Sequence, residues 1–187
     1  MNSLFRLLRV LSLLLALPTL AADFGDLRAA AERLYAESSY AEANKAYLAA
    51  DTNALPKAEA RWVVFRLADT QWRAAATARG TDGEPIQAAK RTLEQLASQD
   101  APPIERDRVW AEANESLGEL HARTGDNRDW VATRYTMALD WWAGQSDFDT
   151  ARARYLALVW KWHRPAYLGS RFEGYWNEIP LPVLDNA

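Results

Sequence analysis

The chain has 187 residues, a formal net charge of −3 and no cysteine, which excludes disulfides and thiol chemistry. Acidic residues outnumber basic ones and lysine is scarce, so the clustered positive charge that binds a nucleic-acid backbone is not expected and no nucleic acid is predicted as a partner. The length suffices for one domain with its own core, and nine tryptophans supply large apolar side chains for it.

Residues 1–22 are predicted to be a secretory signal peptide. Arg6 and Arg9 give a positive N-terminal region, and Val10–Leu17 is a short apolar run followed by small residues. A membrane-spanning helix needs about 20 apolar residues, so the mature form is expected to have no membrane span. The alternative is an amphipathic or buried first helix. The signal predicts an exported protein, periplasmic or associated with the cell envelope.

Residues 23–163 are predicted to form an all-α, helical-repeat domain, because apolar residues recur there at helical spacing while Gly and Pro fall between the segments. No segment shows strand alternation of useful length. About seven helices are expected, beginning near residues 24, 40, 57, 85, 104, 128 and 147. The last of them is expected to end at His163.

Residues 164–187 have a different character, with aromatic residues among Gly and Pro. They are predicted to form an irregular aromatic segment lying against the last helices. Pro182, Val183 and Leu184 look like the first turn of a further, truncated element. This predicts that the sequence is a piece of a longer protein.

A repeated pattern marks two of the expected helix turns. Ser38-Ser39-Tyr40 is followed by Ala43 and Tyr47, and Ser146-Asp147-Phe148 by Ala151 and Tyr155. In the fifth helix, Leu117-Gly118 precedes Gly125-Asp126 as in tetratricopeptide repeats, and Gly118 is expected to allow close approach of a neighbouring backbone. The pattern predicts an irregular α-solenoid of tetratricopeptide-like hairpins; the alternative is a plain helical bundle.

The whole chain resembles the N-terminal helical region of bacterial alpha-2-macroglobulin-like proteins. The segments that carry the resemblance are 31–37, 60–70, 106–112, 138–144 and 152–160. In that family such a region precedes a long series of β-sandwich domains, and many members trap proteases through a thioester formed by a Cys-Glu-Gln motif. This chain has no cysteine, so the resemblance implies context and localisation rather than antiprotease activity of this piece.

No catalytic or cofactor motif stands out in the sequence. Its two histidines, His121 and His163, have no metal-ligand spacing, and a packed His121 is expected. Glu112, Glu115 and Glu119 lie on one helix face, where paired carboxylates could act as acid and base. The preferred interpretation is a solvated face paired with nearby arginines at helical spacing.

Asp69 falls between aromatic residues of the third helix, and a lone buried carboxylate is costly. We therefore predict a structural ion pair with Arg66 or Arg73, or a helix cap, rather than a catalytic acid.

Adjacent tryptophans on a helix point about 100° apart, so one member of each closely spaced set is expected to be exposed and to mark an interaction surface. The candidates are Trp141, Trp142, Trp160, Trp162, Tyr175 and Trp176. The preferred interpretation is that this patch is the surface on which the next domain of a longer chain packs.

The sequence thus predicts a non-catalytic protein–protein interaction scaffold with no cofactor and no metal. Its expected partners are protein surfaces, above all the downstream domains of its own parent chain. Two alternatives remain open: the superhelical domain of a peptidoglycan-processing enzyme, and a glycan binder with tryptophan platforms.

Overall fold

A computed structural model describes residues 24–79 and 83–163 of the chain. The predicted signal segment and the aromatic segment 164–187 lie outside the described residues. Within the described ranges the fold is all-helical, with no strand. None of the helices described there has the length and apolar character needed to cross a bilayer.

Seven α-helices and one 3₁₀ turn make up the described fold. They are α1 (Phe24–Ala36), α2 (Tyr40–Leu48), α3 (Lys57–Arg79), α4 (Glu84–Leu96), the turn η1 (Pro103–Glu105), α5 (Arg108–Thr124), α6 (Arg128–Ala143) and α7 (Phe148–His163). Six of the seven begin within one residue of the position expected from the sequence.

The fifth helix is the exception, because it begins at Arg108 instead of near Ile104. Pro103 opens the 3₁₀ turn η1, and the chain then leaves helical geometry. Asp107 restarts it as the N-cap, where its side chain accepts a hydrogen bond from the Trp110 backbone N–H at 2.8 Å. A side-chain cap of this kind satisfies one of the otherwise unpaired N–H groups at a helix start.

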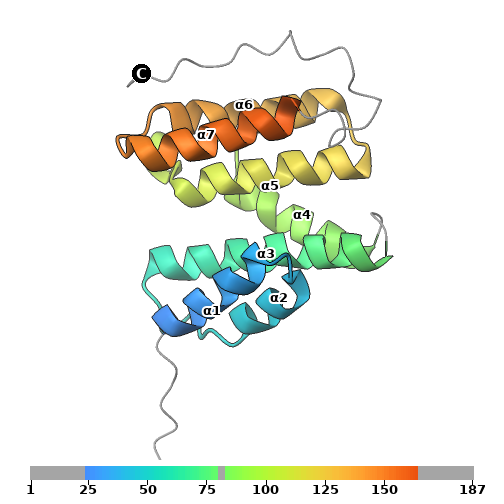
Figure 1. The fold of residues 1–187 in the computed structure, drawn as a ribbon, viewed down its shortest axis with the longest axis vertical. Helices are drawn as coiled ribbons and strands as arrows, with labels where there is room; N and C mark the ends of the chain where they lie inside the picture. The colour runs from blue at the N-terminus through green and yellow to red at the C-terminus, as the bar shows by residue number, and fades with distance from the viewer. Residues whose placement is uncertain (1–23, 80–82, 164–187) are drawn as a thin grey trace, which may run out of the picture.

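Each helix packs chiefly against the next one in the chain, and α3 also contacts α5 directly. Figure 1 shows α1, α2 and α3 in one half of the molecule and α5, α6 and α7 in the other, with α4 running between the halves. Ion pairs join α1 to α3, α3 to α5 and α5 to α7, and we call the side of these odd-numbered helices on which the ion pairs lie the inner face.

Two apolar clusters hold the helices together. The first runs from α1 through α5 and includes Trp62, Phe65 and Trp72 of α3. The second joins α5, α6 and α7 around Tyr135 and Trp142. The helix α5 belongs to both clusters, and every residue from Val109 to His121 is buried.

Gly118 allows a close approach on α5, although the group that approaches is a side chain and not a backbone. A Cβ atom at this position would lie 2.9 Å from the ring of Tyr135 on α6. Tyr135 is itself fully buried, so the ring has little room to move. The glycine therefore fixes how closely α5 and α6 pack.

Candidate functional site

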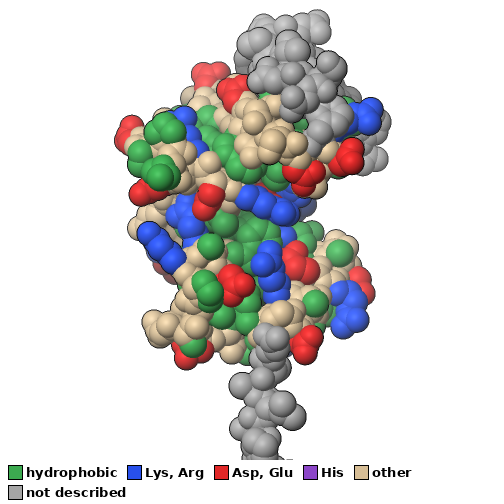
Figure 2. Space-filling view, turned by 90° about the vertical axis from the view of Figure 1, so that its left-hand side faces the viewer, with side chains coloured by type: hydrophobic (Ala, Val, Ile, Leu, Met, Phe, Trp, Pro, Cys, Tyr) green, Lys and Arg blue, Asp and Glu red, His purple; other side chains and the backbone are tan. Residues whose placement is uncertain are grey.

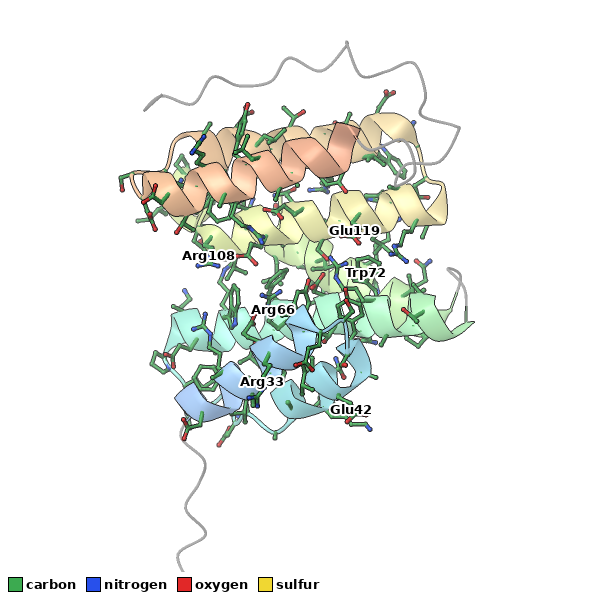
Figure 3. All side chains as sticks on the ribbon, viewed as in Figure 1. Arg33, Glu42, Arg66, Trp72, Arg108 and Glu119 are labelled. Atoms are coloured by element: carbon green, nitrogen blue, oxygen red, sulfur yellow. The ribbon has the colours of Figure 1, made fainter. Side chains whose placement is uncertain are left out.

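A group of charged and hydroxyl side chains fills the space between α3 and α5 and is completed from α1 and α7. We call it the inner cluster. Its members are Glu32 and Tyr35 on α1, Arg66, Asp69 and Arg73 on α3, Glu112, Glu115, Ser116 and Glu119 on α5, and Arg154 on α7. Figure 3 shows Arg66 and Trp72 facing Glu119 and Arg108 across this space.

Asp69 is the most deeply buried carboxylate of the inner cluster, with 1% of its side chain exposed. Its Oδ1 accepts from Arg73 Nε at 3.0 Å and from Ser116 Oγ at 2.5 Å. Its Oδ2 makes no direct hydrogen bond, although Arg66 Nη1 lies 3.7 Å away and the Tyr35 hydroxyl lies beside the carboxylate. Asp69 is thus held between the two arginines that the sequence suggested as its partners.

Two bidentate pairs tie α3 to the helices on either side. Arg66 donates to both oxygens of Glu32 on α1, at 2.8 and 2.7 Å. Arg73 donates to both oxygens of Glu119 on α5, at 2.7 and 2.9 Å. Parallel N–H···O bonds of this kind fix the plane of both groups, so the two arginines set the spacing of three helices.

Glu115 extends the network to α6 and α7. Its Oε1 accepts from Trp142 Nε1 at 2.6 Å, and its Oε2 accepts from Arg154 Nη2 at 2.9 Å. Arg154 also lies 3.5 Å from Glu112, which accepts at 2.7 Å from Arg108 Nε. The carboxylates of α5 are therefore shared by arginines from several helices.

Arginines also surround Trp62, at the edge of the inner cluster. The guanidinium carbons of Arg28, Arg66 and Arg108 lie 4.7, 4.5 and 5.5 Å from its ring centroid. Cation–π contacts of this type are worth about 0.5–2 kcal/mol, more when desolvated. They bring one arginine of α1 and one of α5 to the same aromatic ring of α3.

The inner cluster lines a pocket of about 130 Å³ that is partly open to the surface. It is lined by Tyr35, Phe65, Arg66, Asp69, Arg73, Glu112, Glu115, Ser116 and Arg154. Since a water molecule in the liquid occupies about 30 Å³, the pocket has room for a few waters or one small polar side chain.

The surroundings of Asp69 and Tyr35 in the inner cluster keep the carboxyl ionised and the phenol neutral. Burial opposes the ionisation of Asp69, but Arg73 and Arg66, with the hydrogen bond from Ser116, outweigh it and hold the pKa of Asp69 below its usual range. Burial raises the pKa of Tyr35, and the Asp69 carboxylate adds to this effect. An ionised carboxylate and a neutral phenol serve as hydrogen-bonding groups; neither is poised to exchange protons near neutral pH.

The expectation of a solvated face for Glu112, Glu115 and Glu119 is wrong. Their side chains are only 3, 9 and 4% exposed. Arg108 and Arg123 do pair with Glu112 and Glu119 as their spacing suggested. The face is buried because Arg73 of α3 and Arg154 of α7 supply charge partners from other helices, which local spacing cannot indicate.

Only two of the candidate surface aromatics can be placed. Trp142 is buried in the second apolar cluster, because its indole packs there and donates to Glu115, so it does not belong to an exposed surface. Trp141 is partly buried, and its Nε1 donates to the Arg106 carbonyl at 2.6 Å. The side chains of Trp160 and Trp162, and the whole of Tyr175 and Trp176, lie outside the described residues.

His121 lies apart from the inner cluster, at the turn between α5 and α6. Its Nδ1 is 2.7 Å from Asp126 Oδ2, which also accepts from Lys90 Nζ at 3.0 Å. The ring of Trp130, half-exposed, lies 5.7 Å from the imidazole. Among the residues described, no three His, Cys, Asp or Glu side chains are grouped to hold a metal ion.

Sequence reasoning missed Glu32, Tyr35 and Arg154 as members of the site. Each reaches the inner cluster from a helix distant in sequence. Helical spacing tells which residues share a face of one helix, but it does not tell which faces of different helices meet.

Comparisons of the chain with protein-family models, with curated protein sequences and with solved structures gave no match.

Proposed function

We propose that the protein is a non-catalytic, exported scaffold whose inner face binds another polypeptide. In this proposal the seven helices are an irregular tetratricopeptide-like solenoid. The packing of each helix against its neighbour in the chain, with the further contact between α3 and α5, is what a stack of α-hairpins requires. The odd-numbered helices then form its binding surface.

One observation carries the proposal: charged side chains from four helices converge on the inner face and fix one another there. A plain structural core would be apolar, since replacing buried ion pairs by hydrophobic residues is often neutral or stabilising. Charge concentrated on one side of the fold instead suits recognition, in which polar groups supply specificity. Figure 2, which views the molecule from the left-hand side of Figure 1, shows Lys and Arg side chains, with Asp and Glu among them, around a hydrophobic patch between the two halves.

The pairing of the carboxylates supports a role without turnover. Glu32, Glu112 and Glu119 each lie within ion-pair distance of an arginine, and Asp69 has a lowered pKa. A general acid near neutral pH needs a raised pKa instead. The partner in this proposal is a protein surface in the cell envelope, with the downstream domains of an alpha-2-macroglobulin-like parent chain as the first candidate.

Site-specific photocrosslinking in cells that export the protein tests the proposal. A photoreactive residue placed at position 108, on the inner face, is expected to form an adduct with a polypeptide. The matched control is position 45 on α2, where Lys45 is also basic and exposed. Equal adducts from both positions would contradict the assignment of the inner face.

A glycan-binding alternative keeps one supporting observation, the exposed ring of Trp130, since exposed aromatic rings are common at binding sites. Sedimentation of the purified domain with peptidoglycan separates the two. The glycan-binding proposal predicts that the domain pellets with peptidoglycan, that Trp130→Ala abolishes the pelleting, and that position 108 gives no adduct. These results together would favour the glycan binder over the scaffold.

A further inference from the structure

The charges of the inner face are not distributed evenly between its surface and its interior. The side chains of Glu112 and Glu115 are 3 and 9% exposed. The arginines paired with them, Arg108 and Arg154, are 54 and 36% exposed. The carboxylates of α5 therefore lie beneath the guanidinium groups, and it is the guanidinium end of these two pairs that reaches solvent.

Three arginines are linked by shared partners on this side, and we call Arg28, Arg108 and Arg154 the arginine rim. Shared partners show that they converge: Arg28 and Arg108 both lie over the Trp62 ring, and Arg108 and Arg154 both contact Glu112. They come from α1, α5 and α7, so the arginine rim spans both halves of the molecule.

Buried carboxylates orient two members of the arginine rim, Arg108 and Arg154, without using up their donors. Arg108 engages Glu112 through Nε alone, and Arg154 engages Glu115 through Nη2. A guanidinium carries five N–H donors in a rigid fork, so each arginine keeps donors for a second partner. Groups held in place before binding lose less entropy when the partner arrives.

From this arrangement we propose that the arginine rim recognises an acidic polypeptide segment. The planar guanidinium fork matches the geometry of a carboxylate. The guanidinium groups of Arg108 and Arg154 are more exposed than the carboxylates beneath them, so they would repel a basic segment. A single carboxylate cannot engage arginines on three helices, whereas an extended segment with several Asp or Glu residues can. The inference rests on the proposed function and specifies the chemistry of its partner.

Peptide binding to the mature domain tests the proposal. The probes are a short synthetic peptide rich in Asp and Glu and a matched peptide of the same length rich in Lys, measured by calorimetry at low salt. The acidic peptide is expected to bind and the basic peptide is not. Binding should weaken steeply as salt rises to about 1 M, where the Debye length is about 3 Å.

Arg108→Gln and Arg28→Gln are each expected to weaken binding of the acidic peptide about tenfold, because each removes a charge-assisted hydrogen-bond donor. Arg91→Gln is the matched control, since Arg91 is an exposed arginine paired with Glu84 on α4. Thermal unfolding followed by circular dichroism verifies that all three variants fold.

Three outcomes would overturn the proposal: preference for the basic peptide, no binding of the acidic peptide, or equal binding by the parent protein and both rim variants. None of them would remove the scaffold itself. An adduct from position 108 with a partner that lacks an acidic segment would leave the proposed function standing and refute only the acidic partner.

Discussion

The two sides of α5 are both buried, but one side is apolar and the other is charged. On its apolar side, the helix contributes Ala113, Leu117 and Leu120 to the first apolar cluster and Trp110 and Ala111 to the second. Toward α3 and α7, it presents glutamates whose partners are arginines. The same helix thus contributes an apolar interface whose strength follows buried area and a charged interface whose strength depends on every partner being present.

This difference has a clear consequence for mutations. An apolar side loses stability in proportion to the methyl groups removed and the cavity left behind. On a charged side, the ion pairs add little net stability, because the cost of desolvation offsets their attraction. Removing one partner is nevertheless strongly destabilising, because the remaining charges stay buried without it. The following experiments separate the two behaviours.

The largest effect is expected from Asp69→Asn. The change preserves shape but removes the buried carboxylate that Arg66 and Arg73 share, although each arginine keeps its pair with Glu32 or Glu119. We expect a loss of about 3–5 kcal/mol in the free energy of unfolding, measured by urea denaturation. The same change at the exposed Asp100 is the control, and a loss at Asp69 no greater than the loss at Asp100 would refute the charged interface.

On the apolar side, Leu117→Ala is expected to cost about 3 kcal/mol, because it leaves a cavity in a fully buried position. The loss should be nearly the same at pH 4 and pH 7, since no ionisable group is altered. Urea denaturation at both values measures it, and a strong dependence on pH would show that the two sides are not separate.

Gly118→Ala is expected to destabilise the protein by about 2 kcal/mol, even though alanine favours a helix by about 1 kcal/mol over glycine. The new methyl group would meet the ring of Tyr135 at 2.9 Å. Thermal unfolding measures the effect. A stabilised variant would mean that α5 and α6 are not packed this closely.

Acid should weaken the polar contacts selectively. Burial works against the ionisation of Asp126, but the hydrogen bonds from His121 and Lys90 outweigh it and lower its pKa to about 2. Because a depressed pKa stabilises the ionised folded form, this contribution is full above about pH 4 and is lost as the pH falls toward 2.

Asp126→Asn should therefore remove about 1 kcal/mol at pH 7, after allowance for solvent screening, and almost nothing at pH 2. Urea denaturation across that range measures the difference. A loss that is as large at pH 2 as at pH 7 would contradict the pairing of Asp126 with His121 and Lys90.

The smallest effect is expected for an exposed ion pair. Lys45 contacts Glu42 at 2.8 Å with both side chains largely in solvent. Lys45→Ala should change the free energy of unfolding by no more than about 0.5 kcal/mol. A loss comparable to that of Asp69→Asn would remove the distinction between buried and exposed charge on which the comparison depends.

The sequence predicted the helices well because their signals are local. Apolar spacing and Pro or Gly punctuation located six of the seven starts, and only the 3₁₀ turn at Pro103 displaced the fifth. The position of Asp69 between Arg66 and Arg73 also follows from spacing within one helix.

The inner cluster could be predicted only in part. The sequence around the α5 glutamates gives no sign that they are buried, because Arg73 and Arg154, which pair with them, belong to other helices. Glu32, which pairs with Arg66, likewise comes from another helix. Contacts between residues far apart in sequence depend on how the helices pack. The sequence pattern around a charged residue does not show whether its side chain is exposed to water or paired with an arginine of another helix.

The central claim is that carboxylates hold the buried arginines of α3 in place, and the side-chain N–H groups of these arginines report on this directly. In ¹⁵N NMR spectra at pH 7, the Nε–H signals of Arg66 and Arg73, which donate to Glu32 and Asp69, are predicted to exchange slowly with solvent, while that of exposed Arg91 exchanges fast. If Arg66 and Arg73 exchanged as fast as Arg91, the inner cluster would be open to water and the account would be contradicted.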